Sequence, residues 1–92
     1  MHNNNNIRFS VSQNFSEIPN LQQKSTDTYE VTQLHGNVQI EFISTGKKGT
    51  ISEKKIFDSL TFEEAKGLVL FLSENRIRET AWLEIIDDYC LR

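Results

Sequence analysis

The spacing of apolar residues changes once along this chain, and that change constrains the fold more than any other feature. Between Tyr29 and Phe42 apolar and polar residues alternate, which is typical of strands with one buried face. After Thr61 the apolar residues recur three and four positions apart, as they do in amphipathic helices. The order predicts an α+β domain, in which an antiparallel meander of three to four strands precedes two amphipathic helices that pack on one face of the sheet.

A turn signal divides the alternating region. The segment His35–Asn37 separates two alternating runs, and this pattern predicts a β-hairpin with one apolar face. If the turn uses the first two of these residues, Tyr29 lies opposite Phe42; if it uses the last two, Val31 lies opposite Phe42. Both registers keep the same side chains on the same face, because side chains alternate between faces along a strand.

The segments on either side of this hairpin carry weaker signals. Gly46–Gly49 predicts a second turn, which leads into a strand over residues 50–57. Alternation over residues 7–12 predicts a further strand, and the polar segment 13–28, which contains the only proline, is expected to form a long loop. Three apolar residues of this loop could pin it to the core: Phe15, Ile18 and Leu21.

The helical region opens with a clear start signal. Thr61 and Glu64 fit a capping box, in which each side chain accepts a hydrogen bond from the backbone N–H of the other. One apolar stripe follows: Ala65, Leu68, Val69 and Leu72. Asn75 is the expected end, because asparagine tolerates the left-handed conformation common at helix ends. A second helix is predicted over residues 79–90, with one apolar side: Ala81, Trp82, Ile85, Ile86 and Tyr89.

Composition limits the class of protein. With 92 residues, the chain can form one domain, which we expect over residues 7–92 after a disordered tail at 1–6. The net charge of −3 argues against a general nucleic-acid binder. A single cysteine, Cys90, excludes an intramolecular disulfide, and the longest apolar run, Leu68–Leu72, is far too short to span a bilayer. No secretory signal is evident, so we expect a cytoplasmic protein without membrane contact.

Four lysines surround the second turn, and we call them the lysine hairpin: Lys47, Lys48, Lys54 and Lys55. They do not follow the phosphate-loop spacing, and their flanks are predicted strands, so a nucleotide site is not expected. Lysines on an edge strand prevent sheets from joining edge to edge, which explains the group without a ligand. The alternative is contact with an acidic partner surface or with the phosphates of a nucleic acid.

The last predicted helix has an acidic face formed by Glu84, Asp87 and Asp88. The second and third of these lie in the last turn, where the helix dipole disfavours negative charge. Arg92 is the only cation close to them in the sequence. We therefore expect this face to contact a basic partner.

The first predicted helix leaves an apolar residue outside its stripe. Leu70 points away from the predicted core, Gly67 lies on the same side, and Phe71 lies at the margin of the stripe. Because glycine allows another helix to approach closely, these three residues predict a surface for a partner or for a second copy of the chain. The alternative is that the 13–28 loop covers this side of the helix.

No group of residues indicates catalysis or metal binding. His35 lies in a predicted turn without neighbouring ligands, and Cys90 lacks a nearby histidine that could activate it. We therefore expect no catalytic residue, metal, cofactor or small-molecule substrate, and the main hypothesis is a non-enzymatic protein-binding module: an inhibitor, adaptor or regulatory subunit that acts through its C-terminal helices. The alternatives are a nucleic-acid-associated regulator that uses the lysine hairpin and an accessory subunit of an enzyme.

Overall fold

A computed structural model of the chain describes residues 7–20, 24–78 and 81–91. Four strands precede two helices along the chain: β1 (Arg8–Phe15), β2 (Ser25–Gln33), β3 (Val38–Gly46), β4 (Gly49–Phe57), α1 (Phe62–Glu74) and α2 (Ala81–Cys90). The strands form one antiparallel sheet in the order β1-β2-β3-β4, so each strand pairs with its neighbour in sequence. The predicted α+β class and the meander are therefore confirmed.

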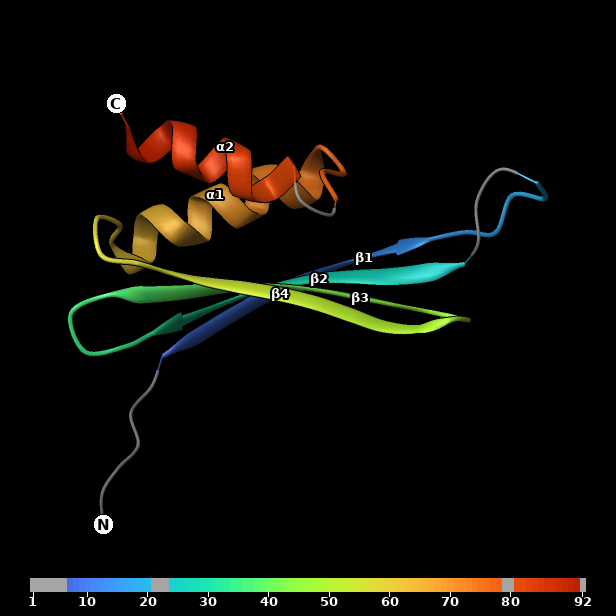
Figure 1. The fold of residues 1–92 in the computed structure, drawn as a ribbon, viewed down its shortest axis with the longest axis horizontal. Helices are drawn as coiled ribbons and strands as arrows, with labels where there is room; N and C mark the ends of the chain where they lie inside the picture. Colours follow the sequence, from blue (N-terminus) through green and yellow to red (C-terminus); the bar gives the residue numbers. More distant parts are fainter. Residues whose placement is uncertain (1–6, 21–23, 79–80, 92) are drawn as a thin grey trace, which may run out of the picture.

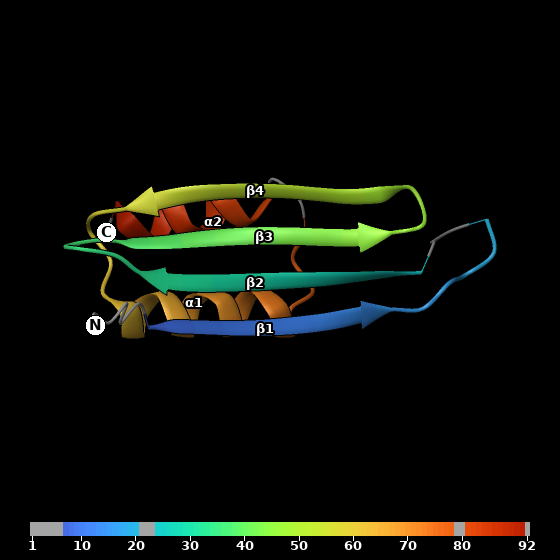
Figure 2. The ribbon, with the colours of Figure 1, turned by 90° about the horizontal axis from the view of Figure 1, so that it is seen from below.

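The two helices lie on the same face of the sheet (Figure 1). Figure 2 shows α1 over β1 and β2, and α2 over β3 and β4. The apolar side chains of the covered face form the core with those of the helices: Tyr29, Val31, Val38, Ile40, Phe42, Phe57, Leu60, Ala65, Val69, Leu72, Trp82 and Ile86. On the opposite face the side chains are mostly polar, as expected of an antiparallel sheet with one face in water.

The β2–β3 register agrees with one of the two predicted alternatives. Tyr29 lies opposite Phe42, and the N–H of Leu34 donates to the carbonyl oxygen of Asn37 at 2.8 Å. The turn therefore uses His35 and Gly36, and Gly36 has a positive φ of 80°. A residue with a side chain rarely adopts such a backbone conformation, and glycine removes that cost.

The second turn also forms as predicted. Gly46 lies opposite Gly49, which leaves Lys47 and Lys48 as the two residues of the turn. Gly49 has a φ of 121°, so it too uses a conformation that favours glycine. β4 follows at once and forms one edge of the sheet.

The predicted loop over residues 13–28 is wrong in its extent. β1 continues to Phe15 and β2 already begins at Ser25, so the pairing is continuous through both ends of that segment. Polar side chains join the two strands on the face away from the helices: Ser12 to Thr28 at 2.8 Å, and Thr26 to Asn14 at 2.9 Å. Hydroxyl and amide pairs of this kind stabilise strands, but a hydrophobic pattern does not reveal them.

The apolar residues of the predicted loop have different surroundings. Phe15 is buried on the helix-covered face of the sheet, whereas Ile18 is exposed. Leu21 lies outside the described residues. Leu70 of α1 remains exposed, so Phe15 and Ile18 do not provide the predicted cover for that side of the helix.

Both ends of α1 agree with the prediction, but the residue that takes the left-handed conformation after the helix differs. The N–H of Glu64 donates to the Thr61 hydroxyl at 3.1 Å, and the N–H of Thr61 donates to Glu64 Oε1 at 2.9 Å, which completes the capping box. Asn75 follows the last helical residue, but its φ is −95° and Arg76 takes the left-handed conformation instead, with φ 54°. The Asn75 side chain donates to the carbonyl oxygen of Phe71 at 2.8 Å and so caps the helix.

A buried ion pair holds the connection between the helices on the sheet. The Asp27 carboxylate, with a side chain only 3% exposed, accepts hydrogen bonds from the guanidinium of Arg78 and from the hydroxyl of Ser44. The guanidinium also stacks over the ring of Phe15, 4.3 Å from its centroid. Nearby, the hydroxyl of Tyr29 donates to the carbonyl oxygen of Ile77 at 2.6 Å, and burial, then the charge of Asp27, raise the pKa of Tyr29 well above its ordinary value.

Ser73 is the exception in this region, because its buried hydroxyl has no hydrogen-bond partner among the described residues. A buried hydroxyl without a partner costs free energy that an apolar side chain of similar size avoids. We expect Ser73→Ala to leave the free energy of unfolding unchanged or to raise it by up to about 1 kcal/mol, measured by urea denaturation. Thr61→Ala is the control and should lower it by about 1 kcal/mol through loss of the helix cap. A clear loss of stability in Ser73→Ala would contradict this prediction.

Candidate partner-binding groove

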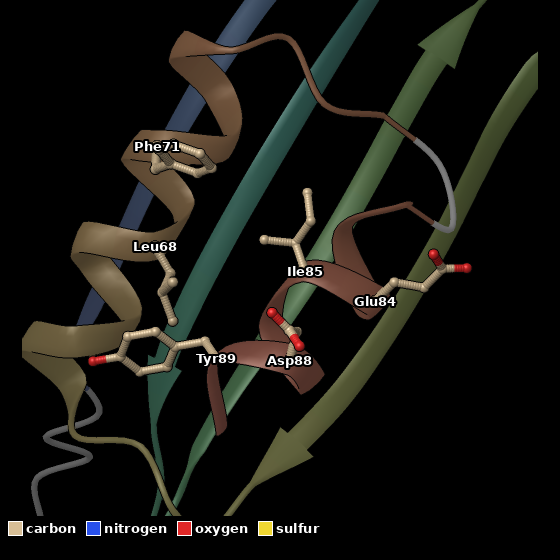
Figure 3. Close-up of a pocket in the computed structure, with 6 residues that line it drawn as sticks. All are labelled: Leu68, Phe71, Glu84, Ile85, Asp88 and Tyr89. Atoms are coloured by element: carbon tan, nitrogen blue, oxygen red, sulfur yellow. The ribbon is translucent and has the colours of Figure 1, made fainter. Parts of the chain in front are cut away.

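A groove of about 420 Å³ lies between α1 and α2 on the surface away from the sheet. Six residues line it: Leu68, Phe71, Glu84, Ile85, Asp88 and Tyr89 (Figure 3). Four of these side chains are apolar or aromatic, and the other two are carboxylates. We call this site the helix groove.

Helical spacing places these side chains. Leu68 and Phe71 are three positions apart, so they lie on one side of α1, next to the buried stripe that contains Val69 and Leu72. Ile85 and Tyr89 are four positions apart and lie together on the side of α2 that faces α1. Figure 3 shows the Tyr89 ring directed toward α1, where it closes one end of the groove.

Two aromatic side chains of the groove are in contact with water. Phe71 is 50% exposed and Tyr89 is 40% exposed, although both lie beside buried residues. Glu84 and Asp88 are exposed along α2 at the margin of the groove. None of the described lining residues carries a positive charge, so the groove combines an apolar floor with an acidic margin.

A hydrogen bond between the helices sets the position of Tyr89. Its hydroxyl donates to Glu64 Oε2 at 3.2 Å, while Oε1 of the same carboxylate accepts the N–H of Thr61. The hydrogen bond from Thr61, followed by the one from Tyr89, lowers the pKa of Glu64, and the bond to Glu64 raises the pKa of Tyr89. The glutamate of the capping box therefore also fixes the aromatic residue at the end of the groove.

Two of the predicted contact residues, Glu84 and Asp88, line the groove, but Asp87 does not. Asp87 lies on the β4 side of α2 and forms an ion pair with Lys55 at 2.9 Å. Lys55 therefore offsets negative charge near the end of α2 from the sheet, although it lies far from Asp87 in the sequence. The sequence could not reveal this pairing, since the partners are 32 positions apart.

Phe71 is the third predicted contact residue that lines the groove, whereas Gly67 and Leu70 lie elsewhere on α1. Leu70 is 37% exposed, and a Cβ added to Gly67 would meet nothing within 4 Å. Lys66, one turn before Leu70, lies over the ring of Phe9 in β1 at 5.4 Å. Leu70 therefore lies toward β1, on the opposite side of α1 from the groove.

The lysine hairpin does not form a single surface. Lys54 lies opposite Glu41 on the open face of the sheet, whereas Lys55 lies on the helix-covered face, 5.3 Å from the centroid of the Phe57 ring. Lys47 and Lys48 lie at the tip of the turn. Contact of these lysines with nucleic acid or with an acidic surface stays a prediction.

Sequence reasoning missed three lining residues because it assigned them to sides that face the core: Leu68, Ile85 and Tyr89. The sequence signal that could have revealed them is their position at the margin of each apolar stripe.

Trp82 is fully buried as expected, and its indole N–H donates to Glu53 Oε1 at 3.2 Å. Within the described residues, no three His, Cys, Asp or Glu side chains gather in a way that could hold a metal ion.

Comparisons with protein-family models, curated proteins and solved structures found no match to this chain. Within the part of the chain that the structure describes, no helix has the length and apolar character that crossing a bilayer requires.

Proposed function

We propose that this protein is a non-enzymatic protein-binding module, an inhibitor, adaptor or regulatory subunit, whose helix groove binds a basic segment of another protein. The observation that carries the proposal is the combination of a half-exposed Phe71 and Tyr89 with carboxylates along the same groove. The proposal also places the protein in the cytoplasm. Its one cysteine, Cys90, is free, which suits a reducing compartment.

The apolar floor would supply most of the affinity. Large apolar side chains contribute about 1.5–3 kcal/mol each when they pass from water into a fully buried environment. Leu68 and Ile85 are already partly buried, so most of the new burial would come from Phe71 and Tyr89. Aromatic residues in such positions are frequent energetic centres of protein interfaces. The partner would therefore insert one or two large apolar side chains between the helices.

The acidic margin selects the charge of the partner. Glu84 and Asp88 would attract arginine or lysine residues that flank the inserted apolar side chain, and Glu64 adds a negative charge at the Tyr89 end. Exposed charges of this kind mainly accelerate association and exclude partners of the same sign. Binding should therefore weaken as the salt concentration rises, because ions screen exposed charges.

Selection of binding peptides from a random display library tests this proposal, because such a library offers the groove basic, acidic and apolar segments alike. We expect the selected peptides to combine a large apolar residue with flanking arginine or lysine, and to shift the NMR signals of Phe71, Ile85 and Tyr89. Phe71→Glu should weaken their binding at least tenfold. Leu70→Glu is the matched control, because the neighbouring residue lies on the other side of α1, and it should bind as the original protein does.

Three results would contradict the proposal. The first is selection of acidic peptides. The second is a shift of NMR signals from the open face of the sheet instead of the groove. The third is equal binding of the peptides by Phe71→Glu and Leu70→Glu. Circular dichroism of both variants should match that of the original chain, because Phe71 and Leu70 are both exposed at the surface of α1.

A further inference from the structure

We propose that the outer edge of β1 pairs with β1 of a second copy, so that one antiparallel sheet runs through a homodimer. Figure 2 shows β1 along one margin of the sheet and β4 along the other. Edge strands present unpaired backbone groups that can pair with another strand. The two edges of this sheet differ in whether their side chains oppose such pairing.

The backbone of β1 has a set of hydrogen-bonding groups on its outer side. The N–H of Gln33 donates to the carbonyl oxygen of Ile7 at 2.9 Å, so the backbone groups of Ile7 point toward β2. Because the backbone groups of successive residues point to opposite sides of a strand, those of the even-numbered residues point outward. The outward groups include those of Ser10, Ser12 and Asn14, in a strand that pairs with β2 without interruption.

The charges of the two edges favour β1 as the paired one. β4 carries Glu53, Lys54 and Lys55, and two further lysines form the turn before it. Lysine on an edge strand is a common means of preventing edge-to-edge association. β1 contains neither lysine nor proline, and its single charged residue is Arg8 at its first position.

A second copy fits this edge because the strand is compatible with itself. In an antiparallel pair related by a twofold axis, the two Arg8 side chains lie at opposite ends of the paired segment, so like charges do not meet. The side chains of Ser10, Ser12 and Asn14 share the open face of the sheet, where hydroxyl and amide groups can pair across the strands. Such an interface is isologous, the commonest arrangement in soluble dimers.

The helical layer would add apolar contact to the paired strands. α1 lies over β1 and β2 (Figure 2). Leu70 lies one turn after Lys66, whose ammonium group lies over the Phe9 ring of β1, so Leu70 is on the β1 side of the helix. When both copies place their helices on the same face, the twofold axis brings the two α1 helices toward each other, with the open space beside Gly67 available for close approach. The dimer would thereby cover the exposed Leu70, while both helix grooves stay on the far side of α1.

Sedimentation equilibrium of three proteins tests the proposal. Ser10 and Ser52 are both serines on the open face of an edge strand, Ser10 in β1 and Ser52 in β4. We expect the original chain to be a dimer, Ser10→Lys to be a monomer, and Ser52→Lys to stay a dimer with the same dissociation constant. Thermal unfolding should show that both variants are folded.

Ser10→Pro provides a second variant in case Ser10→Lys does not fold. Its N–H points outward, so proline removes a donor to the second copy without removing a hydrogen bond to β2, and edge strands tolerate proline at such positions. A monomeric original chain would overturn the proposal, as would a Ser10→Lys or Ser10→Pro protein that stays dimeric. Dissociation caused by Ser52→Lys instead would place the contact at β4 and would also overturn it.

Discussion

Trp82→Ala should lower the free energy of unfolding by about 3–5 kcal/mol, the range typical of large aromatic residues removed from a core. Trp82 is 0% exposed and lies edge-on to the ring of Tyr29, with the ring centroids 6.2 Å apart. It packs α2 against the sheet together with Ile86, which is equally buried, and its loss leaves a cavity under the helix. Urea denaturation followed by circular dichroism would measure the change.

Leu91→Ala is the control for this experiment, because it removes a side chain that is 85% exposed and should change stability by less than about 1 kcal/mol. Trp82→Phe should have an intermediate effect, since it keeps part of the buried apolar surface but removes the donor to Glu53. Equal stabilities of Trp82→Ala and the original chain would mean that α2 presents a different side to the sheet.

Arg78→Ala should lower the free energy of unfolding by about 3 kcal/mol, because it leaves the buried carboxylate of Asp27 without its cation. The Arg78 side chain itself is 33% exposed, so the cost comes mainly from Asp27, whose side chain is 3% exposed. Loss of the guanidinium from the Phe15 ring adds to it. Thermal and urea unfolding at neutral pH would measure the effect.

The exposed ion pair between Lys55 and Asp87 provides the matched comparison. Both side chains are close to half exposed, so Lys55→Ala should cost no more than about 1 kcal/mol. Arg78→Lys should be more stable than Arg78→Ala but less stable than the original chain, because a lysine ammonium cannot reproduce the bidentate hydrogen bonds that the guanidinium donates to Asp27. Equal losses in Arg78→Ala and Lys55→Ala would contradict the prediction that burial decides the difference.

Much of the fold follows from local signals in the sequence. The turns at His35-Gly36 and Lys47-Lys48, the apolar face of β2 and β3, and the capping box of Thr61 all form as the residue pattern predicts. Each of these depends on residues that are close in sequence or adjacent in a hairpin. Their physical requirements, such as a positive φ at a turn, act before any tertiary contact exists.

The extent of β1 shows where such local signals fail. Its pairing with β2 depends partly on polar contacts such as Ser12 with Thr28, and the burial of its last residue, Phe15, depends on the arginines that follow α1. The alternation of apolar and polar residues in the sequence reveals neither the polar contacts nor the burial of Phe15. A polar strand at the edge of a sheet therefore resembles a loop until its partner strand is known.

The candidate site could be predicted only in part. Phe71, Glu84 and Asp88 stand out in the sequence, but nothing local shows that they share one groove while Leu70 and Asp87 point elsewhere. That division depends on the placement of α1 over β1 and β2 and of α2 over β3 and β4 (Figure 2). Asp87 meets Lys55 only because α2 lies above β4.

The sequence by itself determined the class of the fold, the order of its elements and the buried faces of its central strands, because periodicity and turn chemistry act over short distances along the chain. The tertiary structure alone decided the helix groove, the Lys55–Asp87 pair and the Asp27–Arg78 pair, whose members are 51 positions apart. Contacts of this length form only when the helices pack on the sheet, and packing also determines which apolar side chains, such as Phe71 and Tyr89, stay in contact with water.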